Sequence, residues 1–189
     1  MAYPNPSSFV PLVIGSTDGP TLTAAAAASC IPVANRIILP NNYWTIGKSW
    51  HIRMAGRISC AVTTPGTARF DLRTGPSGTI VAYDSGALNL NIVAKTTVPW
   101  WLEVDLTCRA VGTGTSTTLF GMGRFTSEAV VGAPLPSAGG NGVLLCPVSA
   151  PAVGTGFDNT AANAVDMFFT QTVATGSMTV HNYEIWESI

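Results

Sequence analysis

Charged side chains are scarce in this sequence, which limits what its surface can bind. They make up 10% of the 189 residues, whereas about 25% is typical of soluble domains. The net charge is −1 and the basic residues are scattered. Because nucleic-acid-binding proteins gather Lys and Arg on one face, we expect no nucleic-acid partner. Such a composition fits both a soluble domain with a neutral surface and a subunit with large protein contacts.

Groups that catalyse reactions at neutral pH are also few. The two histidines, His51 and His181, fall on the polar phase of strand-like segments, which favours surface positions. No GxSxG, Walker-type or dinucleotide-binding glycine pattern is present. Glu184 and Glu187 are spaced to lie on opposite faces of a strand, which disfavours paired acid–base catalysis. The sequence therefore predicts no enzyme, no catalytic residues and no cofactor.

The cysteines, Cys30, Cys60, Cys108 and Cys146, include no CxxC pair. Structural zinc sites need closely spaced ligand pairs, so no metal site is predicted. Cys60 and Cys108 fall on the apolar phase of strands, which favours buried, reduced thiols and folding in a cytoplasm. No apolar run approaches the roughly 20 residues that span a bilayer, and MAYPNPSSFVPLVIG lacks the basic start of a secretory signal. We expect no membrane partner.

The sequence does have the two-residue hydrophobic period of half-buried β-strands, while helix signals are nearly absent. The clearest strands run from Trp50 to Cys60 and from Trp100 to Ala110. Glycine and proline in TGPSG predict a hairpin between strands at 68–73 and 79–83. Further strands are predicted at 36–39, 88–93, 117–126, 164–173 and 178–186. The fold class predicted is all-β, a jelly-roll-like antiparallel β-sandwich.

Two segments are not typical of core strands. Residues 1–20 contain four prolines, and proline lacks the amide hydrogen that a strand ladder needs, so they are predicted to form an extended N-terminal arm. Residues 131–156 hold four prolines and the run SAGGNG, which is typical of a protruding loop or a contact with a neighbour. Residues 21–189 are predicted to form a single jelly-roll domain, because no repeat or domain-splitting linker is visible.

The polar phases of the strands carry charges of both signs. They are Arg53, Arg57, Arg69, Arg73, Asp71, Glu103 and Asp105. We predict a ladder of these residues across one exposed sheet face, solvated rather than built to bind a carboxylate. Trp100 and Trp101 are adjacent, so if Trp100 is buried Trp101 faces outward. The interpretation favoured for Trp101 is packing under a loop or against another subunit, and the alternative is a platform that stacks sugars.

Six stretches resemble a group of structural proteins from the virions of tailed bacteriophages. They are GKSWHIRMAGRIS, TTPGTARFDLRTG, YDSGALNLN, VPWWLEVDLTCRAVGTGTSTTLFGMGRFTSEAVVG, PAVGTGFDNTAANAVDMFF and MTVHNYEIWES. The resemblance covers residues 36–189 and brings no set of functional residues with it. It implies a virion protein that is made in the cytoplasm of a bacterial host.

Within that group we expect a capsid cement protein, also called a decoration protein, that stabilises the shell. Cement proteins are often β-rich trimers, in which three weak contacts act together. The expected partners are the major capsid protein and further copies of this chain, with the arm pairing to a neighbour's strand or lying in a groove. The predicted contact residues are Tyr3, Pro4, Phe9, Val10 and Trp101. The alternatives are a tail-associated or spike protein and a carbohydrate-binding module.

Overall fold

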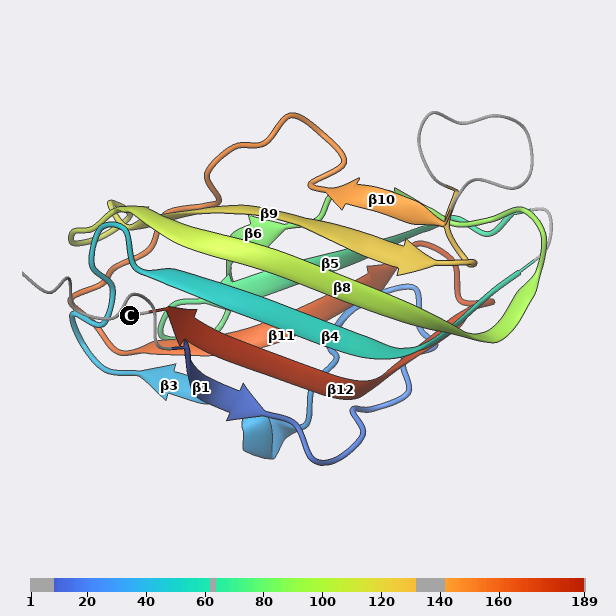
Figure 1. The fold of residues 1–189 in the computed structure, drawn as a ribbon, viewed down its shortest axis with the longest axis horizontal. Helices are drawn as coiled ribbons and strands as arrows, with labels where there is room; N and C mark the ends of the chain where they lie inside the picture. Colours follow the sequence, from blue (N-terminus) through green and yellow to red (C-terminus); the bar gives the residue numbers. More distant parts are fainter. Residues whose placement is uncertain (1–8, 62–63, 132–141, 189) are drawn as a thin grey trace, which may run out of the picture.

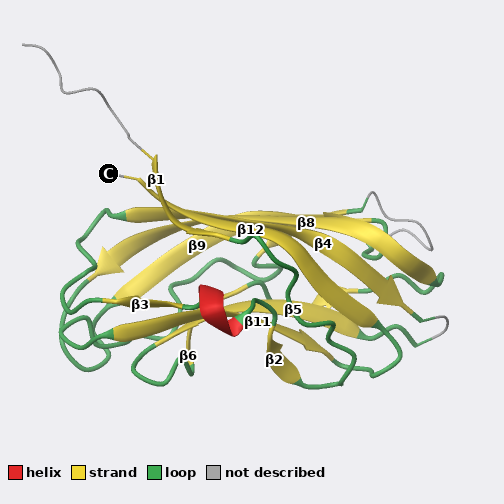
Figure 2. Ribbon diagram, turned by 90° about the horizontal axis from the view of Figure 1, so that it is seen from below, coloured by secondary structure: helices red, strands yellow, loops and turns green. Residues whose placement is uncertain are grey.

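The computed structural model describes residues 9–61, 64–131 and 142–188 (Figure 1). These residues form two antiparallel β-sheets that pack face to face (Figure 2). One short 3-10 turn, η1 (Val33–Asn35), is the single helical element in this part of the chain. The predicted all-β sandwich is confirmed.

The first sheet has the strand order β1-β12-β4-β8-β9-β10. Its strands are β1 (Phe9–Ile14), β12 (Ser177–Ser188), β4 (Ser49–Cys60), β8 (Lys95–Ala110), β9 (Thr118–Ser127) and β10 (Val143–Cys146). The second sheet has the order β2-β11-β5-β6, with β3 on β11 and β7 on β5. Its strands are β2 (Ala27–Ser29), β11 (Asn163–Gln171), β5 (Thr67–Thr74), β6 (Ile80–Asp84), β3 (Ile37–Leu39) and β7 (Leu88–Asn89). The chain crosses between the sheets before β2, β4, β5, β8, β11 and β12, and such repeated crossing is typical of a jelly roll.

The core forms where the apolar phases of the two sheets meet. Trp50, Ile52 and Met54 are buried along β4, as the period of the sequence predicts. At the centre an aromatic cluster joins the sheets. It contains Phe70 and Phe169 from the second sheet and Trp100 and Phe125 from the first. The ring centre of Phe70 lies 5.1 Å from that of Trp100 and 5.2 Å from that of Phe169. Such contacts stabilise the pairing of the two layers beyond area burial alone.

The described part of the predicted arm lies against its own domain. Residues 9–14 form β1, which pairs with β12 along one edge of the first sheet. The pairing shifts between Pro11 and Val13, since an edge strand tolerates the missing amide of a proline at a bulge. The chain then follows β12 further, with the amides of Gly15 and Gly19 donating to the carbonyls of Tyr183 and Val180. Residues 1–8 lie outside the described residues.

Two strand predictions are wrong in detail. The strand expected at 88–93 is limited to β7, Leu88–Asn89, because the side chain of Asn91 accepts the amide hydrogen of Val93 and turns the chain. The segment 131–156, expected to be irregular, contains β10, which pairs with β9. Residues 147–155 are also held, since the amides of Val148 and Thr155 donate to the carbonyls of Ser85 and Val81. Residues 137–141 of the SAGGNG run lie outside the described residues.

Candidate interaction face

A row of alternating charges crosses the outer face of the first sheet. Glu184 on β12, Arg53 on β4, Glu103 on β8 and Arg124 on β9 are neighbours in register. Arg124 Nη2 lies 2.7 Å from Glu103 Oε2, and Arg53 Nε lies 3.7 Å from Glu103 Oε1. Opposite charges on neighbouring strands stabilise the sheet modestly, by about 0.2–1 kcal/mol per pair. Because the side chains of Arg53 and Arg124 are 46% and 63% exposed, they remain open to a partner.

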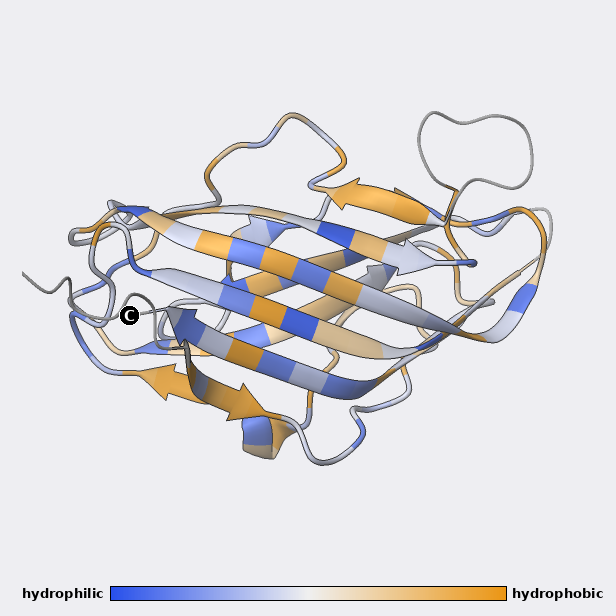
Figure 3. Ribbon diagram, viewed as in Figure 1, coloured by the Kyte–Doolittle hydropathy of each residue, from blue (hydrophilic) through white to orange (hydrophobic). Residues whose placement is uncertain are grey.

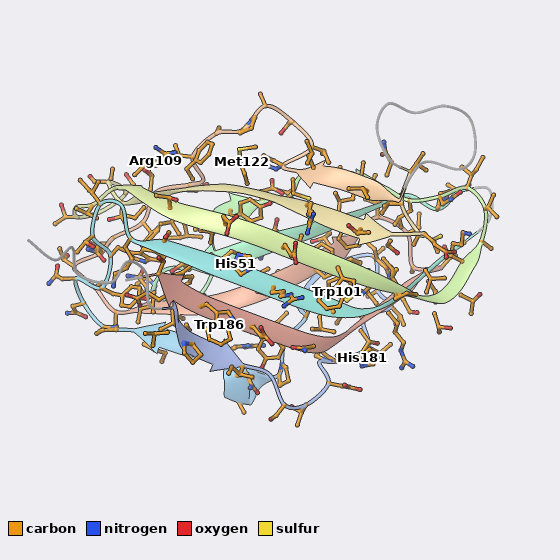
Figure 4. The ribbon with its side chains drawn as sticks, viewed as in Figure 1. His51, Trp101, Arg109, Met122, His181 and Trp186 are labelled. Atoms are coloured by element: carbon orange, nitrogen blue, oxygen red, sulfur yellow. The ribbon has the colours of Figure 1, made fainter. Side chains whose placement is uncertain are left out.

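Aromatic side chains flank this charged row on both sides (Figure 4). Trp101 on β8 is 44% exposed, and the guanidinium carbon of Arg53 lies 4.9 Å from its ring centre. On the other side Trp186 donates from Nε1 to Glu184 Oε2 at 3.0 Å, and His51 Nδ1 lies 2.7 Å from Asp105 Oδ1. We call this surface the outer face. It consists of the charged row, Glu184, Arg53, Glu103 and Arg124, and of the side chains on either side of that row, Trp101, Trp186, His51 and Asp105. It combines apolar rings with fixed charges of both signs.

Open hollows meet at Arg53 on the outer face. One of about 420 Å³ is lined by His51, Arg53, Glu184 and Trp186. Another of about 200 Å³ is lined by Arg53, Trp101, Glu103, Arg124 and Thr126. No described strand or loop lies over the centre of this face in Figure 2. A partner that approached it would meet both tryptophans and the arginine together.

The ladder predicted on one sheet face is wrong, because its residues divide between the two sheets. Arg53, Glu103 and Asp105 belong to the first sheet, while Arg69, Asp71 and Arg73 lie on β5 in the second. The chain crosses from one sheet to the other between β4 and β5, and a strand's phase cannot reveal that crossing. On the second sheet Asp71 is 3% exposed and bonds to Arg69 and Arg73 at 3.0 and 3.1 Å. Burial raises the pKa of Asp71, and the two arginines offset this only in part.

The predicted contact residues do not come together at one site. Tyr3 and Pro4 lie outside the described residues. Phe9 and Val10 begin β1, where Val10 is 39% exposed. Trp101 faces outward, as predicted, but β12 and β4 separate β8 from β1. The edge of the sheet and the outer face are therefore two distinct surfaces.

A third surface, which the sequence did not predict, lies at the edge formed by β10. Val143 and Leu145 point outward, 37% and 70% exposed, beside Met122 and Val148. A groove of about 500 Å³ follows them, which we call the edge groove. It is lined by Met122, Val143, Leu144, Leu145, Pro147, Val148, Ser149 and Pro151. The signal was the alternation in Val143–Cys146, hidden within a segment rich in proline and glycine.

The predictions for the other ionisable residues are confirmed. His51 and His181 both lie outside the core, where His181 Nδ1 is 2.9 Å from Asp18 Oδ1. Glu184 and Glu187 point to opposite sides of β12: Glu184 reaches Trp186, whereas Glu187 binds Lys48 at 2.8 Å and Tyr43. Burial raises the pKa of Glu187, but hydrogen bonds from Lys48 and Tyr43 outweigh it, so this pKa is lowered overall. Glu187 therefore serves as an anchor within the fold.

A hollow of about 420 Å³ lies between β6 and residues 147–155. Its charged lining residues, Arg69 and Asp84, already pair with each other. The ring of Tyr83 packs beside Gly121, where a Cβ atom would lie 2.4 Å from Tyr83 Cδ2. Burial strongly raises the pKa of Tyr83, so its hydroxyl stays protonated. This hollow offers a ligand little chemistry of its own.

All four cysteines are free and buried. Burial raises the pKa of Cys146 to about 12 and that of Cys30 further still, so both thiols are unreactive near neutral pH. Among residues 9–61, 64–131 and 142–188, no group of His, Cys, Asp and Glu side chains is placed to hold a metal ion. Over the same residues the structure has no helix of the length and apolarity needed to cross a membrane.

Comparisons of this chain with protein-family models, with curated proteins and with solved structures find no match.

Proposed function

We propose that this chain is a structural protein of a tailed-phage virion, most specifically a cement protein that binds the major capsid protein and stabilises the shell. Its outer face would lie against the shell, and copies of the chain would assemble as a trimer. The resemblance of residues 36–189 to phage virion proteins supports the class. The observation that carries the choice of surface is the open outer face, where Trp101 and Arg53 are exposed and the half-buried Trp186 lines a hollow beside Arg53.

The outer face has the features of a protein contact. Tryptophan and arginine are the residues that most often supply the binding energy of interfaces. The alternating charges of Glu184, Arg53, Glu103 and Arg124 would fix the orientation of a complementary surface more than its affinity. Three identical faces on one trimer would bind a symmetric shell far more tightly than one face alone.

Purified virions of the phage that encodes the chain provide the first test. Quantitative mass spectrometry should find it in hundreds of copies per particle, as expected when a protein covers a shell. A handful of copies would favour a tail-associated or spike protein instead. Absence from the particle would refute the virion proposal altogether.

The second test places the contact on the outer face. Particles that lack the protein are mixed with purified full-length chain, and co-sedimentation measures binding. The Trp101→Ala variant should bind at least tenfold more weakly. A matched control is Ile38→Ala, because Ile38 is 75% exposed on β3 in the second sheet. Equal binding by both variants would show that the outer face is not the contact.

A carbohydrate-binding module is the second candidate, and two tryptophans on one face, the exposed Trp101 and the half-buried Trp186, favour it. Sugars stack on aromatic rings, and the polar groups of Arg53 and Glu184 lie between Trp101 and Trp186. A glycan array separates the two functions. Binding of an oligosaccharide that is lost in Trp101→Ala and in Trp186→Ala, but kept in Ile38→Ala, would favour the module.

A further inference from the structure

The two edge strands of the first sheet are more hydrophobic than its central strands. Figure 3 shows β1 and β10 coloured as hydrophobic strands, whereas the centres of β12, β4 and β8 mix polar and apolar residues. β1 and β10 are the end strands of the sheet order. At the β10 end, Leu145 is 70% exposed above the edge groove, which is lined by apolar residues and Ser149. Exposed apolar edges of this kind invite pairing with another chain.

We propose that the edge groove of each copy receives residues 1–8 of a neighbouring copy. The inference rests on the proposed function in one respect, that copies of the chain assemble, and it does not require a capsid. It specifies the self-contact that the trimer needs. The outer face stays free for the shell.

The position of β1 supports an occupant from another copy. Phe9 pairs with Ser188, and the register continues through Ser49 and Thr107 to Phe120 on β9. Leu145 pairs with Arg124, four residues further along the same strand. Five strand spacings of about 4.8 Å and four residues of about 3.3 Å place Phe9 and Leu145 of one chain roughly 27 Å apart.

The reach of the N-terminal segment favours a neighbour's groove over its own. Tyr3 precedes Phe9 by six residues, and a fully extended chain spans at most about 3.6 Å per residue, or about 22 Å here. The backbone at Tyr3 therefore falls short of Leu145 in its own chain, and Met1, with a span of about 29 Å, would reach it only as a straight, fully extended chain across the charged outer face. A neighbouring copy has no such restriction.

The chemistry of the segment matches that of the groove. MAYPNPSS has no charged side chain and contains Tyr3, Pro4 and Pro6. No charged residue lines the groove in the part of the chain that the structure describes. Proline-containing segments bind apolar grooves well because they lose little conformational entropy. The contact therefore buries no charged side chain and requires little ordering of the segment.

The placement of the two surfaces also predicts the kind of symmetry. The segment leaves one edge of the first sheet, and the groove lies at the opposite edge. A contact between two different surfaces of the same chain is head-to-tail, and it produces a ring if the rotation closes. A ring of three copies is the trimer expected for a cement protein.

Native mass spectrometry of the full chain tests the contact with two charge-introducing variants. Tyr3→Asp and Leu145→Asp should each weaken assembly at least tenfold, so that the monomer dominates at micromolar concentration. The matched control, Ile38→Asp, should assemble as the wild type does. Leu145 and Ile38 are 70% and 75% exposed, so both variants should fold, which thermal melting checks. A wild-type monomer at micromolar concentration, or unchanged assembly of both test variants, would overturn the inference.

A cysteine cross-link tests which chains touch. Chains that carry only Tyr3→Cys are mixed with chains that carry only Leu145→Cys under mild oxidation. The mixture should form a disulfide-linked dimer, while each variant alone forms far less. Failure to cross-link in the mixture would contradict the contact. Particle binding is measured separately, so a chain that forms rings but ignores capsids refutes the proposed function and leaves this contact standing.

Discussion

The outer faces of the two sheets use the same residue types in opposite ways. On the first sheet Glu103 lies between Arg53 and Arg124, and both arginines extend into solvent. On the second sheet Asp71 and Asp166 are 3% and 5% exposed, although each pairs with arginine. One face therefore keeps its charges in water, where a partner can reach them. The other uses its charges to hold its own strands together.

The cause of the difference is what covers each carboxylate. Arg73 binds Asp71 and also lies over the ring of Phe168, with 3.9 Å from its guanidinium carbon to the ring centre. Asp166 accepts a hydrogen bond from Ser29 at 2.6 Å and forms an ion pair with Arg36, whose Nε lies 2.8 Å from Oδ2. Within the part of the chain that the structure describes, Glu103 is less covered, with a side chain that is 26% exposed. Because the carboxylates of the second face are buried, their ion pairs matter for stability. They cannot readily be replaced by contacts with another protein.

The largest effect should come from Asp71→Asn. This change removes a carboxylate oxygen that accepts from Arg73, whose side chain is 20% exposed, and should lower the free energy of unfolding by about 2 kcal/mol. Urea unfolding followed by tryptophan fluorescence measures it. The matched control is Asp84→Asn, because Asp84 pairs with Arg69 but is 37% exposed, and it should cost less than about 1 kcal/mol. Equal losses would mean that burial does not distinguish the two pairs.

A smaller effect is expected from Phe168→Leu. The change keeps an apolar side chain but removes the aromatic ring beneath the guanidinium of Arg73, so it should cost about 1 kcal/mol. The same unfolding experiment applies. In the Asp71→Asn background the loss should differ from that in the wild type, because Arg73 contacts both residues. Strict additivity would show that the ring and the carboxylate do not act on Arg73 together.

The features that could be predicted from the sequence are those that follow from the local alternation of polar and apolar residues along a strand. The burial of Trp50 and Trp100 and the outward direction of Trp101 follow from the two-residue period. The neighbours of Trp101 do not, since long-range pairing brings Arg53 to it from another strand. The division of the charges between two faces depends on where the chain crosses between sheets. β10 escaped prediction because four alternating residues are a weak pattern among prolines and glycines.

A third and smaller effect is the dependence of stability on pH. It should differ between Asp166, where burial dominates the pKa shift, and Glu187, where hydrogen bonds dominate it. Burial raises the pKa of Asp166 above 3.8, and Ser29 and Arg36 offset this only in part. Its titration thus adds stability that is fully present below 3.8 and is lost as pH rises through the folded pKa. Glu187 has a pKa below 4.5, so its contribution is present above 4.5 and is lost as pH falls through the folded pKa.

Asp166→Asn and Glu187→Gln should therefore change with pH in opposite directions. As pH rises from about 3 to about 7, the stability of the wild type relative to Asp166→Asn should fall. Over the same range its stability relative to Glu187→Gln should rise. Urea unfolding at intervals of pH measures both differences. Slopes of the same sign would contradict the assignment of these two environments.

The smallest effect on stability should come from Glu103→Gln, at the centre of the open face. Because its ion pairs are exposed, the loss in free energy of unfolding should be below about 0.5 kcal/mol. The same variant places Arg53 and Arg124 beside a neutral side chain, so under the proposed function it should change the rate of particle binding and its dependence on salt. Asp84→Asn, on the other sheet, should leave particle binding unchanged. A large loss of stability in Glu103→Gln would mean that the charges of the first face hold the fold together as those of the second do, and that they are not free to bind a partner.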